Sequence, residues 1–253
     1  MTGLSGAVIA VNRDGTVTKR GGSPGRTREQ GEWIVAYGSE IFPAIVQTIE
    51  DGYIMEKLKH VNYWDVSPYF IHSSLKNYVW SQPAVTPPTV NTRQLLLEKV
   101  EVIINKSLKN IVSNATKKRI IAEADKAATG AYNFRPALAH GDPTAENVMN
   151  RAGYGNVLID PIKSSEAVPD SPAVDVGKML QSAYGWESAK HRTGVIAYKP
   201  ADVADALNDD ELFEIGQSWA VVHIVRAVPY IIKNLPESLG SVIDVLETVI
   251  ERP

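Results

Sequence analysis

The sequence predicts an α+β protein in which a small sheet-rich N-terminal part precedes a larger, mainly helical C-terminal part. The apolar run Ala7–Val11 and the extended run 16–19 flank an Asp-Gly pair, which is typical of a tight β-hairpin turn. The segment 28–37 then has apolar residues at helical spacing. Helical periodicity dominates from residue 59 onward, so we predict two parts, 1–58 and 59–253.

The remaining elements follow from apolar spacing and from the residues that interrupt it. Two more strands are predicted over 42–49 and 53–58, separated by a turn that contains Gly52. The segment 83–91 contains three prolines and is predicted to be a loop. Helices are then predicted from a cap at Asn91 or Thr92, from Asn114 to a stop at Gly130, over 209–234 with a kink or end at Pro229, and over 236–251.

Composition places the chain among folded soluble proteins and excludes several classes of function. The chain has 253 residues, of which 44% are hydrophobic and 22% charged. It contains no cysteine, which excludes disulfides, thiolate metal sites and a cysteine nucleophile. A net charge of −3 argues against nonspecific nucleic-acid binding. No apolar run approaches the roughly 20 residues that span a bilayer, and no signal segment is recognised. We therefore expect a soluble, cytoplasmic protein that binds neither nucleic acid nor membrane.

Residues suited to chemistry gather in one non-helical stretch of the C-terminal part. His140-Gly141-Asp142 is followed by Asn147 and then by an apolar strand that ends in Asp160. Two short strands, 147–149 and 157–159, joined by a Gly-containing turn, would bring Asp142, Asn147 and Asp160 close together. Oxygen ligands of this kind suit Mg²⁺, which proteins hold through one or two carboxylates plus substrate phosphates. Taken singly, Asp142 or Asn147 is more often a turn or cap residue, but the ordered combination favours a site.

This ordered pattern resembles the catalytic core of the aminoglycoside phosphotransferase and choline kinase group, whose members share the protein-kinase-like fold. Protein kinases have His-Arg-Asp, an Asn five positions later, and then Asp-Phe-Gly. In this chain Gly141 stands in place of that Arg and Pro161 in place of that Phe, as in the small-molecule branch. The downstream segment 172–180 also resembles that branch, in which an Asp-leading helix packs under the catalytic loop. The resemblance implies a two-lobed fold with a small antiparallel-sheet N-lobe and a larger helical C-lobe that contains the catalytic loop 139–161.

The resemblance extends to the N-terminal part, where it implies a nucleotide site. Lys19 ends the second strand of the hairpin, at the place of the lysine that holds nucleotide phosphates. Glu29 is expected to hold Lys19 as an ion pair, with Glu32 as the alternative. The segment 52–58 resembles the hinge strand, which implies that backbone groups of Glu56 and Leu58 hydrogen-bond adenine.

The nucleotide lid departs from the pattern of the family. The family has a strand, a glycine-rich loop and a second strand before the lysine strand, whereas this chain has room for one strand before the hairpin turn. Ser5 and Gly6 are expected to form a remnant of that loop, with their amides facing phosphate. The shortened lid keeps open a pseudokinase, which binds nucleotide and acts through a protein partner.

For the C-terminal part the resemblance implies one role for each residue of the motif. Asp142 accepts the proton of a substrate hydroxyl, and Asn147 and Asp160 hold Mg²⁺. His140 braces the loop by hydrogen bonding, and Asp175 accepts backbone N–H groups of the same loop. Both of these roles are structural.

The leading hypothesis is an ATP- and Mg²⁺-dependent phosphotransferase that acts on a hydroxyl of a small molecule such as a sugar, an aminoglycoside or an amino alcohol. The pseudokinase is the alternative. A protein kinase is less supported because no activation segment with Ala-Pro-Glu is present, and a metal-dependent phosphohydrolase leaves Lys19 unexplained. The only partner expected is the acceptor substrate, and the oligomeric state stays open.

Overall fold

The computed structural model describes residues 7–22 and 25–252, and within them the mixed α+β class predicted from the sequence is confirmed. The chain folds as two compact units. The first unit comprises Met1–Asn62 and Glu146–Lys163, and the second comprises Tyr63–Ala145 and Ser164–Pro253. The chain therefore leaves the first unit, enters the second, and returns to the first for one short segment before completing the second.

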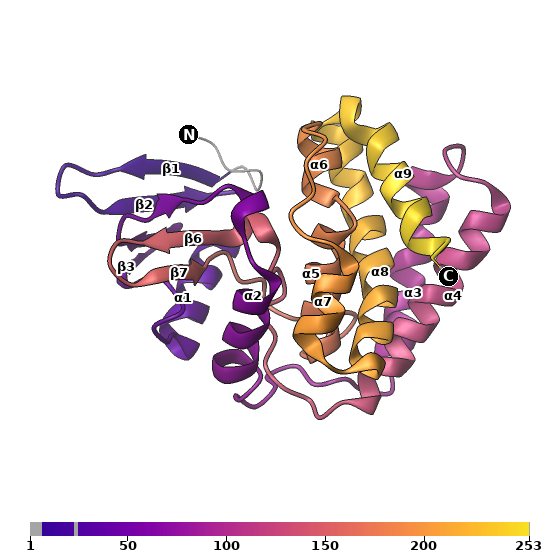
Figure 1. The fold of residues 1–253 in the computed structure, drawn as a ribbon, viewed down its shortest axis with the longest axis horizontal. Helices are drawn as coiled ribbons and strands as arrows, with labels where there is room; N and C mark the ends of the chain where they lie inside the picture. The colour runs from indigo at the N-terminus through magenta and orange to yellow at the C-terminus, as the bar shows by residue number, and fades with distance from the viewer. Residues whose placement is uncertain (1–6, 23–24, 253) are drawn as a thin grey trace. The chain divides into compact units, whose positions relative to one another are not determined.

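The strands lie in the first unit, together with the N-terminal helix, and the other helices lie in the second unit (Figure 1). The elements of the first unit are β1 (Ala7–Val11), β2 (Val17–Gly21), α1 (Arg26–Tyr37), β3 (Ile45–Ile49), β4 (Gly52–Met55), β5 (Lys59–His60), β6 (Val148–Arg151) and β7 (Gly155–Leu158). The helices of the second unit are α2 (Pro68–Ser74), α3 (Thr92–Ile103), α4 (Asn114–Gly130), α5 (Pro172–Ala183), α6 (Trp186–His191), α7 (Pro200–Leu207), α8 (Asp210–Asn234) and α9 (Leu239–Ile250).

The main sheet of the first unit is antiparallel and has the order β1-β2-β4-β3. The predicted hairpin is present, because β1 and β2 pair from Ala7 opposite Gly21 to Val11 opposite Val17. Asp14 stabilises the turn by accepting hydrogen bonds from the backbone N–H and the hydroxyl of Thr16. One face of the sheet is apolar, with Tyr53 fully buried at its centre, and α1 packs against β4 and β3.

A second sheet, β5-β6-β7, explains why the segment Glu146–Lys163 belongs to the first unit. Arg151 on β6 donates to the carboxylate of Glu56 at 2.7 Å and to the carbonyl oxygens of Glu40 and Phe42. The backbone N–H of Leu158 donates to the carbonyl of Ile41 at 2.8 Å. These long-range bonds fasten the β6–β7 hairpin to the chain around β3.

Two predictions about this region differ from the structure. The strand predicted over 53–58 ends at Met55, because Glu56 turns its carboxylate toward Arg151 and the backbone N–H of Ala44. The boundary predicted after residue 58 assigns the whole segment 59–253 to the helical part, whereas Glu146–Lys163 folds with the sheets. Both differences arise from contacts between residues that are far apart in the sequence.

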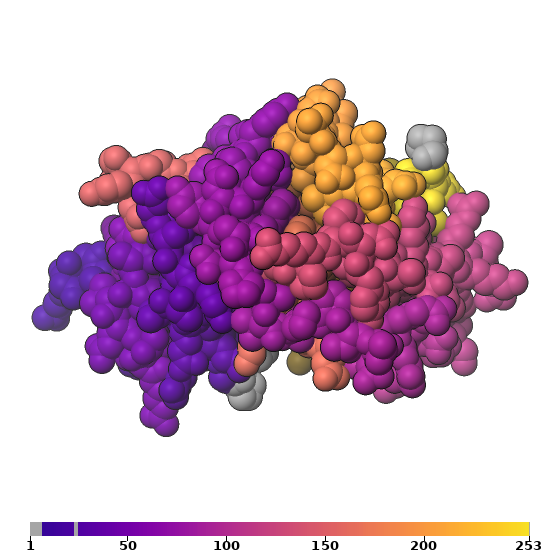
Figure 2. All heavy atoms as spheres, turned by 90° about the horizontal axis from the view of Figure 1, so that it is seen from below, coloured from indigo at the N-terminus to yellow at the C-terminus, as the bar shows by residue number. Residues whose placement is uncertain are grey.

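The core of the second unit is the contact between α5 and α8, which run side by side (Figure 1). Trp219 on α8 is fully buried against Gly177 on α5, where a methyl group on Gly177 would lie 2.4 Å from the Cβ of Trp219. The absence of a side chain at Gly177 therefore sets how closely these two helices approach. The magenta and pink atoms of the segment that contains α3 and α4 form one side of this unit (Figure 2).

Two features of helix α8 bear on the sequence analysis. Of the two alternatives predicted at Pro229, a kink or an end, the structure excludes the end, because the helix continues to Asn234. By length and composition α8 is also apolar enough to cross a membrane, although no such segment is predicted from the sequence. In the structure 67% of its most apolar window is buried inside the protein, as is common for a core helix of a soluble protein.

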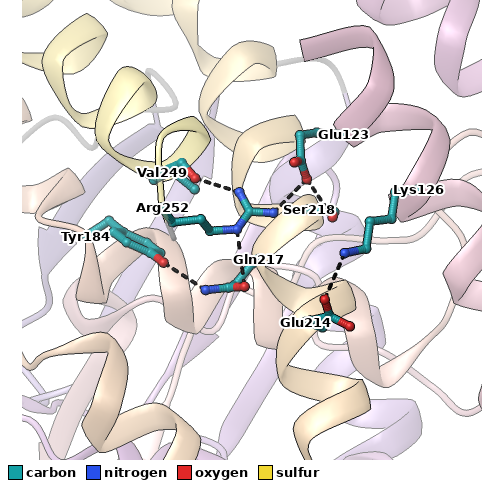
Figure 3. Close-up of polar contacts among 8 residues, drawn as sticks. All are labelled: Glu123, Lys126, Tyr184, Glu214, Gln217, Ser218, Val249 and Arg252. Carbon is teal, nitrogen blue, oxygen red and sulfur yellow. Dashed lines mark hydrogen bonds and ion pairs between the residues drawn. The ribbon is translucent and has the colours of Figure 1, made fainter. Parts of the chain in front are cut away.

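A polar network joins the C-terminal helix to the rest of the second unit (Figure 3). Arg252, just beyond α9, donates to Glu123 on α4 at 2.7 Å and to Gln217 on α8 at 3.2 Å. The hydroxyl of Ser218 donates to the same Glu123 carboxylate at 2.7 Å, and Gln217 donates to the Tyr184 hydroxyl at 3.0 Å. One guanidinium thus connects three helices near the end of the chain.

The close approach of α5 and α8 gives a stability prediction. Gly177→Ala should lower the free energy of unfolding by about 1–3 kcal/mol, because the added methyl group meets both the side chain and the backbone of Trp219. Gly240→Ala, also in a helix, meets no atom within 4 Å and should raise it by about 0.5–1 kcal/mol. Urea unfolding measures both changes, and equal effects of the two substitutions would contradict the packing argument.

Candidate active site

Lys19 is a buried cation of the first unit with partners from three segments of the chain. Its side chain is 4% exposed. The Lys19 Nζ donates to the carboxylate of Asp160 at 2.5 Å and to the amide oxygen of Gln30 at 3.1 Å. It also lies 6.0 Å from the centre of the Tyr53 ring, within the range of a cation–π contact. Lys19 and Asp160 are 141 positions apart in the sequence, so the fold brings them together.

The partner of Lys19 on α1 is Gln30 and not Glu29 or Glu32. Both glutamates are exposed, and Glu32 pairs with Arg28 at 2.7 Å. Helix α1 begins at Arg26, two residues earlier than predicted, and turns Gln30 inward on the same face as Thr27 and Ile34. The helical period alone would have pointed to Gln30, because it shares the spacing of the apolar face. The expectation of an acidic partner obscured this signal.

Asn147 and Asp160 lie next to each other at the open end of the β6–β7 hairpin. Val148 pairs with Leu158, and the backbone N–H of Ile159 donates to the Asn147 carbonyl at 2.9 Å. Asp160 follows directly and has a φ of 60°, which turns its carboxylate out of the strand direction toward Lys19. The two residues predicted as metal ligands are therefore neighbours in the first unit.

The donor set fits a hard divalent cation held jointly with a ligand. Asp160 offers carboxylate oxygens and Asn147 offers an amide oxygen. The Asp160 side chain is 30% exposed and therefore accessible. Among the described residues no group of three or more His, Asp or Glu side chains is arranged to hold a metal by itself. Mg²⁺ is usually bound through one or two carboxylates together with phosphate oxygens and water, and Asp160 with Asn147 matches that mode.

Tyr53 closes the inner side of the Lys19 site. Tyr53 is fully buried, with a relative exposure to solvent of 0%. Burial raises the pKa of the Tyr53 hydroxyl well above its usual value, and the neighbouring Asp160 charge raises this pKa further. The tyrosine therefore stays neutral, and the positive charge of Lys19 is balanced by Asp160 alone among the contacts described above.

In the second unit a buried carboxylate shapes the Asp142 loop, residues 139–145. Asp175 on α5 accepts hydrogen bonds from the backbone N–H of His140 at 3.0 Å and of Gly141 at 2.7 Å, and from the indole N–H of Trp80 at 2.9 Å. Gly141 has a φ of 79°, a conformation that favours glycine. The backbone N–H of Asp142 donates to His140 Nδ1 at 3.3 Å. The hydrogen bonds expected for Asp175 and His140 are thus present.

Burial raises the pKa of Asp175 to about 7, while the hydrogen bonds from Trp80, Gly141 and His140 oppose this rise. The nearby Asp170 carboxylate adds to the rise. Asp170 itself accepts from the backbone N–H groups of Val85, Thr86 and Ala139, so it supports the beginning of the same loop. Two buried carboxylates therefore hold the Asp142 loop through its backbone.

Asp142 has a cationic partner that the sequence analysis missed. Lys178 on α5 lies 2.9 Å from the Asp142 carboxylate, and the two side chains are 15% and 22% exposed. Lys178 is three positions after Asp175, so both project from one face of α5 toward the loop. The three-residue spacing between Asp175 and Lys178 was the sequence feature that could have identified this partner of Asp142.

The remaining predicted residues divide into two groups. Ser5 and Gly6 lie outside the described residues. The Glu56 carboxylate binds Arg151, the Glu56 N–H donates to the Ala44 carbonyl at 3.0 Å, and Leu58 is buried. The contacts of Glu56 are structural, and the binding of adenine by Glu56 and Leu58 stays a prediction.

The assignment of Gln30 can be tested by stability. Gln30→Leu should lower the free energy of unfolding by about 1–3 kcal/mol, because the buried Lys19 ammonium loses one hydrogen-bond acceptor. Glu29→Gln is the matched control on the same helix and should change it by less than about 0.5 kcal/mol. A large loss of unfolding free energy in Glu29→Gln would instead support the Lys19–Glu29 ion pair expected from the sequence.

The raised pKa of Asp175 predicts a pH dependence. The folded protein keeps the Asp175 proton up to about pH 7, whereas the unfolded chain releases it near its ordinary pKa of 3.8. Stability from this group therefore falls as the pH rises from about 4 to about 7, by at most about 4 kcal/mol. Asp175→Asn removes the titration, so the difference in unfolding free energy, wild type minus variant, should decrease over this range. A difference that stays constant with pH would contradict the assignment.

Comparisons with known proteins bear on the fold. Neither a protein-family model nor a curated protein matches the sequence. Among solved structures, the chain is similar to choline kinase LicA from Streptococcus pneumoniae, with 12% identity and a TM-score of 0.66 over 99% of this chain and 91% of that chain. LicA has also been solved in complex with AMP.

Two further solved structures are also similar to this chain. The Plasmodium vivax ethanolamine kinase is 13% identical, with a TM-score of 0.56 over 96% of this chain and 81% of that chain. The GDP complex of aminoglycoside 2'-phosphotransferase-IIIa is 10% identical, with a TM-score of 0.60 over 96% of this chain and 89% of that chain. The chain therefore has the protein-kinase-like fold of these small-molecule kinases and phosphotransferases, as the resemblance in its sequence implies.

Proposed function

We propose that the protein is an ATP- and Mg²⁺-dependent phosphotransferase that transfers the γ-phosphate to a hydroxyl of a small molecule. The observation that carries this proposal is the ion pair between Lys19 and Asp160, 141 positions apart. A phosphate-binding lysine and a magnesium-binding carboxylate have to lie within reach of one triphosphate, and these two residues meet that requirement inside the first unit.

The first unit supplies the nucleotide-binding groups of the proposal. Lys19 contacts phosphate oxygens, and Gln30 and Tyr53 hold its ammonium in place without adding negative charge. Asn147 and Asp160 would hold Mg²⁺, which neutralises charge on the phosphate oxygens when bound. The structures of LicA with AMP and of aminoglycoside 2'-phosphotransferase-IIIa with GDP support a nucleotide ligand for this fold.

The second unit supplies the group that meets the acceptor. Asp142 takes the proton of the acceptor hydroxyl, and the acceptor oxygen bonds to the γ-phosphorus as the bond from that phosphorus to the β–γ bridging oxygen breaks. ADP leaves with the bridging oxygen. Phosphoryl transfer depends mainly on alignment and on charge neutralisation. Asp175 provides the alignment by fixing the backbone just before Asp142.

The pseudokinase remains the second candidate, because Gln30 stands where an acidic partner of Lys19 was expected. In that case the protein binds nucleotide but transfers no phosphate. Both candidates share a cytoplasmic location and a small-molecule nucleotide, and they differ in whether an acceptor is used.

Replacement of Asp142 tests the proposal. With Mg²⁺-ATP and a panel of hydroxyl compounds, the wild-type protein should release ADP in an acceptor-dependent manner. Asp142→Asn should lower this rate by about 10²- to 10⁴-fold, because the proton of the hydroxyl loses its acceptor. Asp205→Asn, an exposed carboxylate on α7, is the matched control and should leave the rate unchanged.

Circular dichroism is the control for folding, and the Asp142→Asn protein should give the spectrum of the wild type. ATP binding without any acceptor-dependent ADP release in the wild type would favour the pseudokinase. Full activity in Asp142→Asn would contradict the role of the carboxylate.

A further inference from the structure

One face of α5 contacts the Asp142 loop at three successive places. Asp175 accepts from the backbone at the beginning of the loop, and Lys178 pairs with Asp142 itself. Ser182 makes the third contact, because its Oγ accepts from the backbone N–H of Ala145 at 3.1 Å. Residues three and seven positions apart lie on the same side of an α-helix. The loop therefore follows α5, and Ser182 holds the end of the loop that comes after Asp142.

The Ser182 hydroxyl links the loop to α6. It donates to the carboxylate of Glu187 on α6 at 2.6 Å, and both side chains are fully buried. Gly185 lies between the two helices and has a φ of 91°, a conformation that favours glycine. The chain turns at this glycine, and the turn lets Glu187 reach a serine five positions earlier.

Glu187 determines where the hydroxyl proton of Ser182 points. A serine within a helix can donate to the carbonyl oxygen four residues earlier, which here belongs to Lys178. A carboxylate is a stronger acceptor than a neutral carbonyl, so the proton points to Glu187 and a lone pair of Oγ is left for the Ala145 N–H. Burial raises the pKa of the adjacent Tyr198 hydroxyl, and the Glu187 charge raises this pKa further, so Tyr198 stays neutral. The contact of Ser182 with the loop therefore depends on Glu187.

The stretch between Asp142 and Ala145 has little conformational freedom. The ring of Pro143 fixes its own φ. The backbone N–H of Thr144 donates to the Asp142 carbonyl at 2.8 Å, which closes a tight turn. A displacement of Ala145 is therefore passed on to Asp142 and is not absorbed by the two residues between them. The hydrogen bond from Ala145 to Ser182 thus bears directly on the position of Asp142.

We propose that Ser182 and Glu187 are positioning residues for Asp142, because they hold the end of its loop in the geometry that phosphoryl transfer requires. This proposal rests on the proposed phosphotransferase function and adds two residues to it that lie outside the motif. Both act through the backbone N–H of Ala145, so neither is a catalytic residue.

The first test separates kcat from KM, using Mg²⁺-ATP and the hydroxyl compound that gives the highest rate of ADP release in the wild type. Ser182→Ala should lower kcat by about 10- to 100-fold, because a misplacement of about 1 Å has an effect of this size. The KM for ATP should change by less than about 3-fold, since the nucleotide-binding groups of the first unit are unaltered. Glu187→Gln keeps an oxygen acceptor without the charge and should lower kcat by about 3- to 10-fold, which also tests the proposal if Ser182→Ala does not fold. A wild-type kcat in both variants overturns the proposal.

Ser218→Ala is the matched control for lost stability. Ser218 on α8 is also fully buried and also donates to a carboxylate, that of Glu123 at 2.7 Å (Figure 3). The substitution should therefore lower the free energy of unfolding, as Ser182→Ala does, but leave kcat unchanged. Urea unfolding measures the stability of both variants. A similar fall of kcat in both would assign the effect to stability and overturn the proposal.

Hydrogen exchange tests the anchoring of the loop without any measurement of activity. In Ser182→Ala the amide of Ala145 should exchange at least about 10-fold faster than in the wild type, whereas the amide of Gly141, which Asp175 holds, should keep its rate. Equal exchange at Ala145 in the two proteins overturns the proposal. If no compound stimulates ADP release in the wild type, the phosphotransferase function fails, and faster exchange confined to Ala145 still supports the anchoring of the loop by Ser182.

Discussion

The second unit depends on one buried carboxylate. Asp175 has no contact with solvent, and a carboxylate in such a place is stable only when donors surround it. Its donors are two successive backbone N–H groups of the Asp142 loop and the indole of Trp80. The loop and α5 are therefore fixed to each other, and Lys178, one turn further along α5, comes to lie against Asp142. The position of Asp142 thus follows from a residue that takes no direct part in the proposed chemistry.

A comparable constraint operates in the first unit, where the buried ion is a lysine. Lys19 is neutralised by Asp160, and its second polar contact, Gln30, is uncharged. A glutamate at position 30 would place two carboxylates around one ammonium and leave the buried group with a net negative charge. With glutamine the pair is neutral, and in the proposed function phosphate oxygens would meet a lysine whose charge is shared with a single carboxylate. Glutamine at position 30 therefore holds the Lys19 ammonium without adding a second carboxylate to the site.

The sequence predicted those features that depend on local spacing or on an ordered motif. The Asp-Gly hairpin, the helix ending at Gly130 and the loop bonds of Asp175 belong to this class. The sequence did not predict features that depend on contacts between residues far apart in the chain. The early end of β4 depends on Arg151, nearly a hundred positions after Glu56. The helical period places Gln30 on the buried face of α1, but the resemblance implied an acidic partner for Lys19 and so pointed to Glu29 instead.

Neither the motif nor the fold determines which acceptor the protein uses. In the proposed function the motif residues act on the nucleotide and on a hydroxyl, which every acceptor of this reaction has. The fold is shared by choline, ethanolamine and aminoglycoside enzymes at 10–13% identity, so the fold by itself does not identify the acceptor either.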